Sequence, residues 1–277
     1  MGITMGNSGS TESRILGVAK EAARAAGDVL LTHMSRVQHY ELQHKDQFDF
    51  ATEVDHAAEK TIIEFVKHHF PGHSILAEEG GDRYGTDSEY QWIIDPLDGT
   101  TNYLHGVRAF AVSIAVLSGN SLQAAVVFDP TRDEMYTAER GRGAYLNGGR
   151  IHVSHHRELH ECLFATGFPF RQKEDIEPYL ESFKTFFGSV RDIRRMGAAA
   201  LDLAYIAAGR FDGFWELGLE KWDIAAGILL IQEAGGTVSG FSGWDNYFEN
   251  GNIVASNGFV HDKMLSVLGT VFPEKEE

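Results

Sequence analysis

Four acidic residues of this chain stand where an apolar segment ends or a helix begins. Glu78 follows a short apolar run, Asp95 and Asp98 lie in the segment Trp92–Asn102, and Asp223 opens a second apolar run. Carboxylates directed at one point repel each other unless a cation lies between them. Carboxylate and carbonyl oxygens, without cysteine or paired histidine, favour Mg²⁺ over Zn²⁺. The acids therefore predict a magnesium site, although each acid alone also fits a solvated turn or a helix cap.

The segment Trp92–Asn102 combines an apolar run with two acids, a proline, a glycine and two hydroxyls. Pro96 restricts Asp95 to an extended conformation, so we expect Asp95 to close a buried strand. Gly99 permits a tight turn, and Thr100 and Thr101 then begin a short helix. The free N–H groups at the start of that helix suit a phosphate.

Composition limits the partners of this chain. It has 277 residues, 43% of them hydrophobic, which is enough for one large domain or two closely packed ones. Its 24 basic and 40 acidic residues give a net charge of −16, which disfavours direct binding to nucleic acid or acidic lipid. No membrane span or signal peptide is predicted, so we expect a cytoplasmic protein. The lone Cys162 excludes an intramolecular disulfide and fits a small buried side chain.

Hydrophobic periodicity predicts alternating helices and strands rather than a repeat or a linker. Three successive strands joined by tight turns indicate an antiparallel meander, and further turns follow at 141–143 and 147–149. Helices are predicted near 12–34, 55–69, 176–187, 198–208, 222–234 and 261–268, and strands near 74–77, 110–117, 122–128, 134–138, 163–166, 211–217 and 253–255. If there are two subdomains, they are 1–150 and 151–277, with the seam near 146–161.

Other common sites are not supported. The chain contains 13 histidines but no His-Glu-x-x-His arrangement of the zinc peptidases. The spacing of Asp95 and Asp98 lacks the alternating acids of a calcium-binding hand. No dinucleotide fingerprint and no Walker A sequence occurs.

Two motifs together resemble the signatures of the inositol monophosphatase family. Trp92–Thr101 resembles the first signature, and Trp222–Gly227 followed by Glu233–Gly236 resembles the second. The resemblance extends from about Ile15 to about Leu268. It is strongest to the bacterial enzymes, through the segments Ala165–Phe170 and Ala200–Tyr205. It implies an α/β (α+β) fold, a layered αβαβα sandwich shared with fructose-1,6-bisphosphatases, with a largely antiparallel N-terminal sheet.

The same resemblance implies which residues hold metal and activate water. One Mg²⁺ is expected on Glu78, Asp95 and the Leu97 carbonyl, a second on Asp95, Asp98 and Asp223, and a third, weaker one near Glu78. Lys45 matches a family lysine near the outer metal. The expected catalytic residues are Glu78 and Thr100, which orient the water, and Asp55, which polarises the threonine hydroxyl. The substrate is expected to contact Glu78, Leu97, Asp98, Gly99, Thr100, Arg194, Gly197, Ala198, Ala199, Glu216 and Asp223.

The function implied is Mg²⁺-dependent hydrolysis of a small phosphate monoester, with myo-inositol-1-phosphate as the first candidate and with lithium inhibition. Two metals about 3.5–4 Å apart can bind both the attacking and the leaving oxygen. Fructose-1,6-bisphosphate, histidinol phosphate, a 3′-phosphonucleotide and NADP remain alternatives. Many relatives carry serine or threonine where this chain has Ala198, so the substrate preference stays open.

The resemblance also implies partners. A homodimer is usual in the family, and its bacterial members also act in ribosomal RNA transcription. RNA polymerase or an antitermination factor is therefore a candidate partner. The acidic net charge favours a protein partner over direct contact with RNA.

Overall fold

The computed structural model describes residues 8–40, 47–80 and 88–273. Lys45 and the loop residues 81–87 lie outside the described residues. The helices are α1 Ser8–Tyr40, α2 Gln47–His69, α3 Thr100–Leu104, α4 Ile176–Phe187, α5 Ala199–Ala207, α6 Lys221–Glu233, α7 Tyr247–Asn250 and α8 His261–Val271, with the 3₁₀ turns η1 Leu159–Glu161 and η2 Lys173–Asp175. The strands are β1 Ser74–Ala77, β2 Tyr90–Asp98, β3 Ala111–Ser118, β4 Ser121–Asp129, β5 Glu134–Glu139, β6 Gly143–Leu146, β7 Gly149–Ile151, β8 Leu163–Thr166, β9 Asp192–Arg194, β10 Gly213–Glu216, β11 Thr237–Ser239 and β12 Ile253–Ser256.

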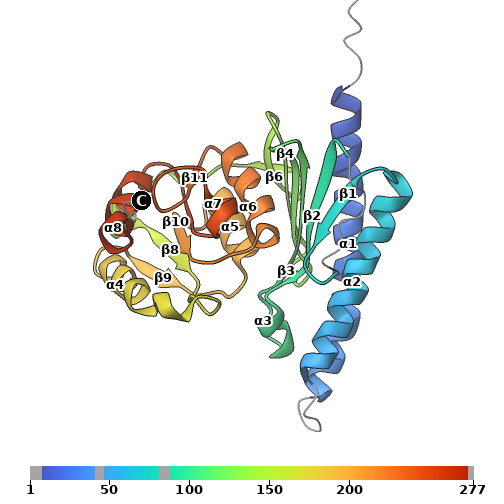
Figure 1. Cartoon of the computed structure of the whole chain (residues 1–277), viewed down its shortest axis with the longest axis horizontal. Helices are drawn as coiled ribbons and strands as arrows, with labels where there is room; N and C mark the ends of the chain where they lie inside the picture. The colour runs from blue at the N-terminus through green and yellow to red at the C-terminus, as the bar shows by residue number, and fades with distance from the viewer. Residues whose placement is uncertain (1–7, 41–46, 81–87, 274–277) are drawn as a thin grey trace, which may run out of the picture.

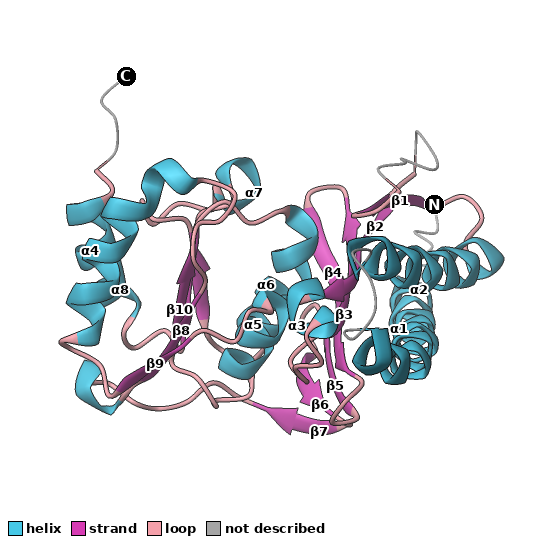
Figure 2. Ribbon diagram, turned by 90° about the horizontal axis from the view of Figure 1, so that it is seen from below, coloured by secondary structure: helices cyan, strands magenta, loops and turns pink. Residues whose placement is uncertain are grey.

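These elements form five layers (Figure 1). Helices α1 and α2 cover one face of a seven-stranded sheet, and α5 and α6 lie between this sheet and a five-stranded one. Helices α4 and α8 cover the outer face of the second sheet, as the perpendicular view shows (Figure 2). The predicted αβαβα sandwich is confirmed.

The seven-stranded sheet has the order β1-β2-β3-β4-β5-β6-β7. Only the β1–β2 pair is parallel, and the remaining neighbours are antiparallel, as the predicted meander requires. Strands β6 and β7 were predicted only as turns. Asn147 and Gly148 both have positive φ, 48° and 81°, and such a two-residue turn joins short antiparallel strands.

The prediction that Asp95 closes its strand was wrong, because β2 continues to Asp98. Asp95 pairs with Ser113 and Asp98 with Ala111, and the register shifts between the two pairs. Pro96 lies in this irregularity, where a residue without an N–H interrupts no regular ladder bond. Both acids therefore lie on β2, one on each side of the bulge.

Apolar packing fills each space between the layers. One cluster of buried side chains lies under α1 and α2 and includes Trp92 and Tyr103, and a second lies around α5 and α6. A third surrounds Trp215 beside α4 and α8, and it contains the free, fully buried Cys162. The apolar stripes of α1 and α2 face the sheet, and their burial in the first cluster stabilises both helices.

Strand β7, the last strand of the first sheet in chain order, lies within the predicted seam, and β8, the first strand of the second sheet, follows it. The second sheet has the order β11-β12-β10-β8-β9. Helices α5 and α6 belong to the second half of the chain but share a buried cluster with Ile93 and Tyr136 of the first sheet. The division at residue 150 stays a prediction.

Candidate active site

Three buried carboxylates converge at the boundary between the first sheet and the central helices. Asp95 and Asp98 come from β2, and Asp223 comes from the first turn of α6. One oxygen of each lies within 4.8 Å of an oxygen of the others. Their exposed fractions are 1%, 8% and 5%. Acids separated by more than 120 positions in the chain thus share one point only because the fold brings α6 against β2.

Backbone N–H groups orient all three carboxylates. Oδ1 of Asp95 accepts from the Leu97 N–H at 2.9 Å, and Oδ2 of Asp98 accepts from the Ala200 N–H at 2.8 Å. Oδ2 of Asp223 accepts from the Glu220 N–H at 2.7 Å. A carboxylate has about four lone-pair positions, so each retains acceptor capacity for a cation.

Asp223 also serves the helix that carries it. Its side chain and that of Glu220 form a reciprocal capping box at the start of α6. The sequence left open whether this acid is a cap or a ligand, and the structure shows a capping contact together with convergence on the other acids. The cap holds the carboxylate in place, which suits a ligand.

Glu78 extends the cluster. It follows β1, its N–H donates to the Ile94 carbonyl at 3.2 Å, and it lines the same cavity as Asp95, Asp98 and Asp223. Burial, reinforced by the Asp223 charge, raises the pKa of Glu78 to about 7.

The two acids of β2 are perturbed in the same direction. Burial and then Asp223 raise the pKa of Asp98 to about 8, and burial and then Glu78 raise the pKa of Asp95 well above its ordinary value. Ionised together, these acids repel, and a bound cation removes that repulsion. The donor set of carboxylates beside the Leu97 carbonyl therefore fits Mg²⁺.

The predicted water-activating residues lie close to this cluster. Oγ1 of Thr100 donates to the Leu97 carbonyl oxygen at 3.1 Å. Asp55 is 4% exposed, and its Oδ1 has no hydrogen-bond partner within the described part of the chain. Burial, followed by the charge of Glu79, raises the pKa of Asp55 to about 8. Polarisation of the Thr100 hydroxyl by Asp55 stays a prediction.

Gly99 shapes the end of the site next to α3. Its φ of 95° is in the left-handed region, and a Cβ there would lie 2.9 Å from the Ala109 carbonyl oxygen. Gly99, Thr100 and Thr101 line the larger cavity, of about 730 Å³, together with Glu78 and the three converging acids. The predicted short helix after Gly99 is confirmed as α3.

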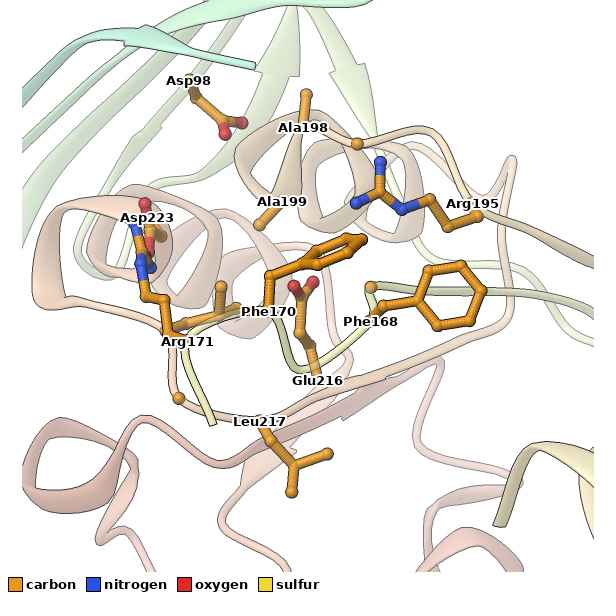
Figure 3. A pocket seen from close by; sticks show the side chains of 14 residues that line it. Asp98, Phe168, Phe170, Arg171, Arg195, Ala198, Ala199, Glu216, Leu217 and Asp223 are labelled. Carbon is orange, nitrogen blue, oxygen red and sulfur yellow. The ribbon is translucent and has the colours of Figure 1, made fainter. Parts of the chain in front are cut away.

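A second, smaller cavity of about 170 Å³ shares several lining residues with the larger one. Asp98 and Asp223 line both cavities. The smaller one continues over Gly197, Ala198, Ala199 and Glu216, four of the residues expected to contact substrate. Figure 3 shows the Glu216 carboxyl next to the Phe170 ring, with Asp98 and Asp223 on the left of the view and Arg195 on the right.

Arg194 was expected to contact substrate, but it does not line either cavity. Its Nη1 pairs with Asp192 Oδ2 at 2.5 Å and donates to the Ile193 carbonyl at 3.1 Å. The adjacent Arg195 lines both cavities, and its guanidinium lies 5.4 Å from the ring centre of Phe170. A substrate contact by Arg194 stays a prediction.

Sequence reasoning missed Phe168, Phe170, Arg171 and Arg195 as individual lining residues. Arg171 and Arg195 approach the pocket from opposite sides (Figure 3). The available signal was the motif Ala165–Phe170 itself, which places aromatic side chains directly after β8.

Comparisons with known proteins agree with the resemblance found in the sequence. Residues 11–271 match the sequence profile of the inositol monophosphatase family. Nus factor SuhB of Pseudomonas aeruginosa is 48% identical over 263 residues, which are 94% of this chain and 97% of that protein. Nus factor SuhB of Escherichia coli is 48% identical over 252 residues, which are 91% of this chain and 94% of that protein.

Among solved structures, the inositol monophosphatase from Anabaena superposes with a TM-score of 0.85 at 40% identity, covering 96% of this chain and 99% of that one. The extragenic suppressor protein SuhB from Bartonella henselae gives a TM-score of 0.85 at 41% identity, covering 92% and 98%. None of the helices in the described ranges is long and apolar enough to cross a membrane.

Proposed function

We propose, because this chain belongs to the inositol monophosphatase family, that it hydrolyses a small phosphate monoester with Mg²⁺, and that myo-inositol-1-phosphate is its substrate. The observation that carries the proposal is the convergence of Asp95, Asp98 and Asp223, with Glu78 on the same cavity. Four carboxylates would repel a phosphate on their own. A divalent cation among them reverses the local charge and makes the cavity an anion site.

The residues divide into ligands and water-orienting groups. Glu78, Asp95 and the Leu97 carbonyl would hold one Mg²⁺, and Asp95, Asp98 and Asp223 a second, with a third near Glu78 as a further expectation. Bound Mg²⁺ supplies Lewis-acid stabilisation of phosphate oxygens and a lower pKa of bound water. The Thr100 hydroxyl and the Glu78 carboxylate would orient the attacking water, and Asp55 would polarise the threonine hydroxyl.

The smaller cavity would hold the alcohol part of the substrate. Glu216 offers a carboxyl acceptor, and residues Gly197 to Ala199 line the same cavity. Ala198 has no hydroxyl, so only its backbone can contact substrate. A polyol such as inositol matches these groups, because its hydroxyls both donate and accept hydrogen bonds.

The metal site is tested by Asp95→Asn and Asp223→Asn. Both variants should fold and lose Mg²⁺-dependent phosphate release, while Asp262→Asn, an exposed acid on α8, should retain it. Full activity in either ligand variant would refute the assignment. Circular dichroism of each variant confirms that the loss does not come from unfolding.

The substrate is tested by a parallel screen. Release of phosphate from inositol-1-phosphate, fructose-1,6-bisphosphate, histidinol phosphate, a 3′-phosphonucleotide and NADP is compared as kcat/KM. A much higher kcat/KM for another ester would replace inositol-1-phosphate as the proposed substrate. Inhibition by millimolar lithium is expected, and its absence would argue against the second metal position.

A second function is favoured by the relatives named Nus factor SuhB. We propose that this chain also binds RNA polymerase or an antitermination factor in the cytoplasm. Its net charge of −16 supports a protein partner rather than direct contact with RNA. Pull-down with wild type and Asp223→Asn tests this role, and capture of neither partner by either protein would refute it. Sedimentation equilibrium tests the expected homodimer.

A further inference from the structure

Gly167 and Glu216 lie side by side at the ends of two parallel strands. In the five-stranded sheet, β8 and β10 are neighbours, and Thr166 pairs with Trp215. Gly167 is the first residue after β8, and Glu216 is the last residue of β10. Both residues line the smaller cavity.

The Glu216 carboxyl occupies the space that a side chain at position 167 would need. A Cβ on Gly167 would lie 2.0 Å from Oε1, 2.1 Å from Cδ and 2.2 Å from Oε2 of Glu216, and these are the three nearest atoms. Gly167 is not among the residues with positive φ, so its backbone would accept alanine. The absence of a side chain at this position therefore serves the carboxyl group, and not the backbone.

The carboxyl group held there is free to bind a ligand. Within residues 8–40, 47–80 and 88–273, the structure shows no protein hydrogen bond to the Glu216 carboxyl, which faces the cavity between Phe170 and Ala199 (Figure 3). A carboxylate oriented in this way can accept from two adjacent hydroxyls at once.

We propose that Gly167 is a specificity-determining position. Because it has no side chain, the Glu216 carboxyl can lie against the end of β8, and there it would bind a vicinal diol of the substrate. The inference rests on the proposed function, and it concerns which phosphate ester the site prefers. Gly167 itself touches no reacting atom and acts through Glu216. An alanine there would force the carboxyl into a cavity of only about 170 Å³.

A kinetic cycle tests this role. Gly167→Ala, Glu216→Ala and the double variant are compared on inositol-1-phosphate and on phenyl phosphate, which has the scissile phosphate but no hydroxyl. Gly167→Ala should lower the ratio of the two kcat/KM values by roughly tenfold, through KM for inositol-1-phosphate, because one buried polar contact is misplaced. The kcat/KM for phenyl phosphate should fall less, because the phenyl group makes no hydrogen bond to the carboxyl. In the Glu216→Ala background the same alanine should have no further effect.

Two further variants complete the experiment. Glu216→Asp, which is shorter by one methylene, should partly restore the ratio when combined with Gly167→Ala. Gly72→Ala is the matched control, because it adds a methyl group with no atom within 4 Å. Equal losses for both esters, or the same loss of selectivity with and without the Glu216 carboxyl, would overturn the inference.

Thermal unfolding separates this inference from the proposed function. Gly167→Ala should lower Tm in the wild-type background and have a smaller effect in the Glu216→Ala background, because the two side chains compete for one space. If wild type hydrolyses neither ester, the proposed function has failed, and this stability cycle still measures the contact. Absence of coupling in the cycle refutes the inference.

Discussion

Arg171 and Asp223 form an ion pair of 2.7 Å at the point where the two cavities meet. The bonded carboxyl oxygen, Oδ2, also accepts the N-terminal capping bond from the Glu220 N–H. One acid thus connects the start of α6, the proposed metal position and the pocket wall after β8. The guanidinium is the charge partner of Asp223 whenever no metal is bound.

This pair predicts that Arg171→Gln destabilises the metal-free protein more than the Mg²⁺-bound protein. Without metal, Asp223 loses its charge partner, and we expect the free energy of unfolding to fall by about 1 kcal/mol, because the arginine is half exposed and its contribution is screened. With Mg²⁺ the cation takes over that role. Urea unfolding in EDTA and in Mg²⁺ measures both values, with Lys173→Gln as a control for lost charge in the same segment. An equal loss under both conditions would contradict the prediction.

The raised pKa values predict the pH dependence of stability without metal. Asp98 titrates at about 8 and Glu78 at about 7 in the folded protein, against ordinary values of 3.8 and 4.5. Between these limits the folded state binds more protons than the unfolded state, so stability is full at low pH and is lost as pH rises from about 4 to 8. Tm in EDTA should therefore fall across this range. Saturating Mg²⁺ should reduce the slope, because it favours the ionised acids, and Asp98→Asn should reduce it in EDTA. A slope unaffected by both changes would contradict the prediction.

Gly99→Ala should destabilise the protein by about 1–3 kcal/mol, because alanine is strained at positive φ and its Cβ would collide with the Ala109 carbonyl. Gly235→Ala provides the matched control, since Gly235 has a similar φ of 90° and no atom within 4 Å of the added methyl. Urea unfolding should show a larger loss for Gly99→Ala. Equal losses would mean that the backbone conformation alone accounts for the glycine.

The two neighbouring arginines give opposite predictions. Arg195 lines both cavities, whereas Arg194 is held by Asp192. Arg195→Gln should raise KM for inositol-1-phosphate several-fold, because a cation beside the bound anion is lost. Arg194→Gln should change KM less than twofold. A larger effect of Arg194→Gln would contradict this prediction. It would support the substrate contact of Arg194 expected from the family resemblance, and the pairing of Arg194 with Asp192 would not describe the substrate-bound protein.

The spacing of apolar residues predicted most helices and strands correctly where that spacing was regular. The strands 74–77 and 163–166 and the helix 176–187 have the predicted bounds. Short elements such as β9, β11 and α7 were missed, because three or four residues contain too few periods to define a pattern. The end of β2 was wrong because tertiary pairing with β3 resumes after the bulge at Pro96.

The sequence by itself determined the chemistry: hard oxygen donors at Glu78, Asp95, Asp98 and Asp223, a glycine turn and two hydroxyls beside them, and too much negative charge to bind an anion without a cation. Residue types and local spacing suffice for such statements. Only the tertiary structure decided that Asp223 reaches β2, that Arg195 rather than Arg194 faces the pocket, and that Gly167 leaves room for Glu216. These relationships depend on side-chain direction across strands and helices that are distant in the chain, and local sequence does not encode that direction.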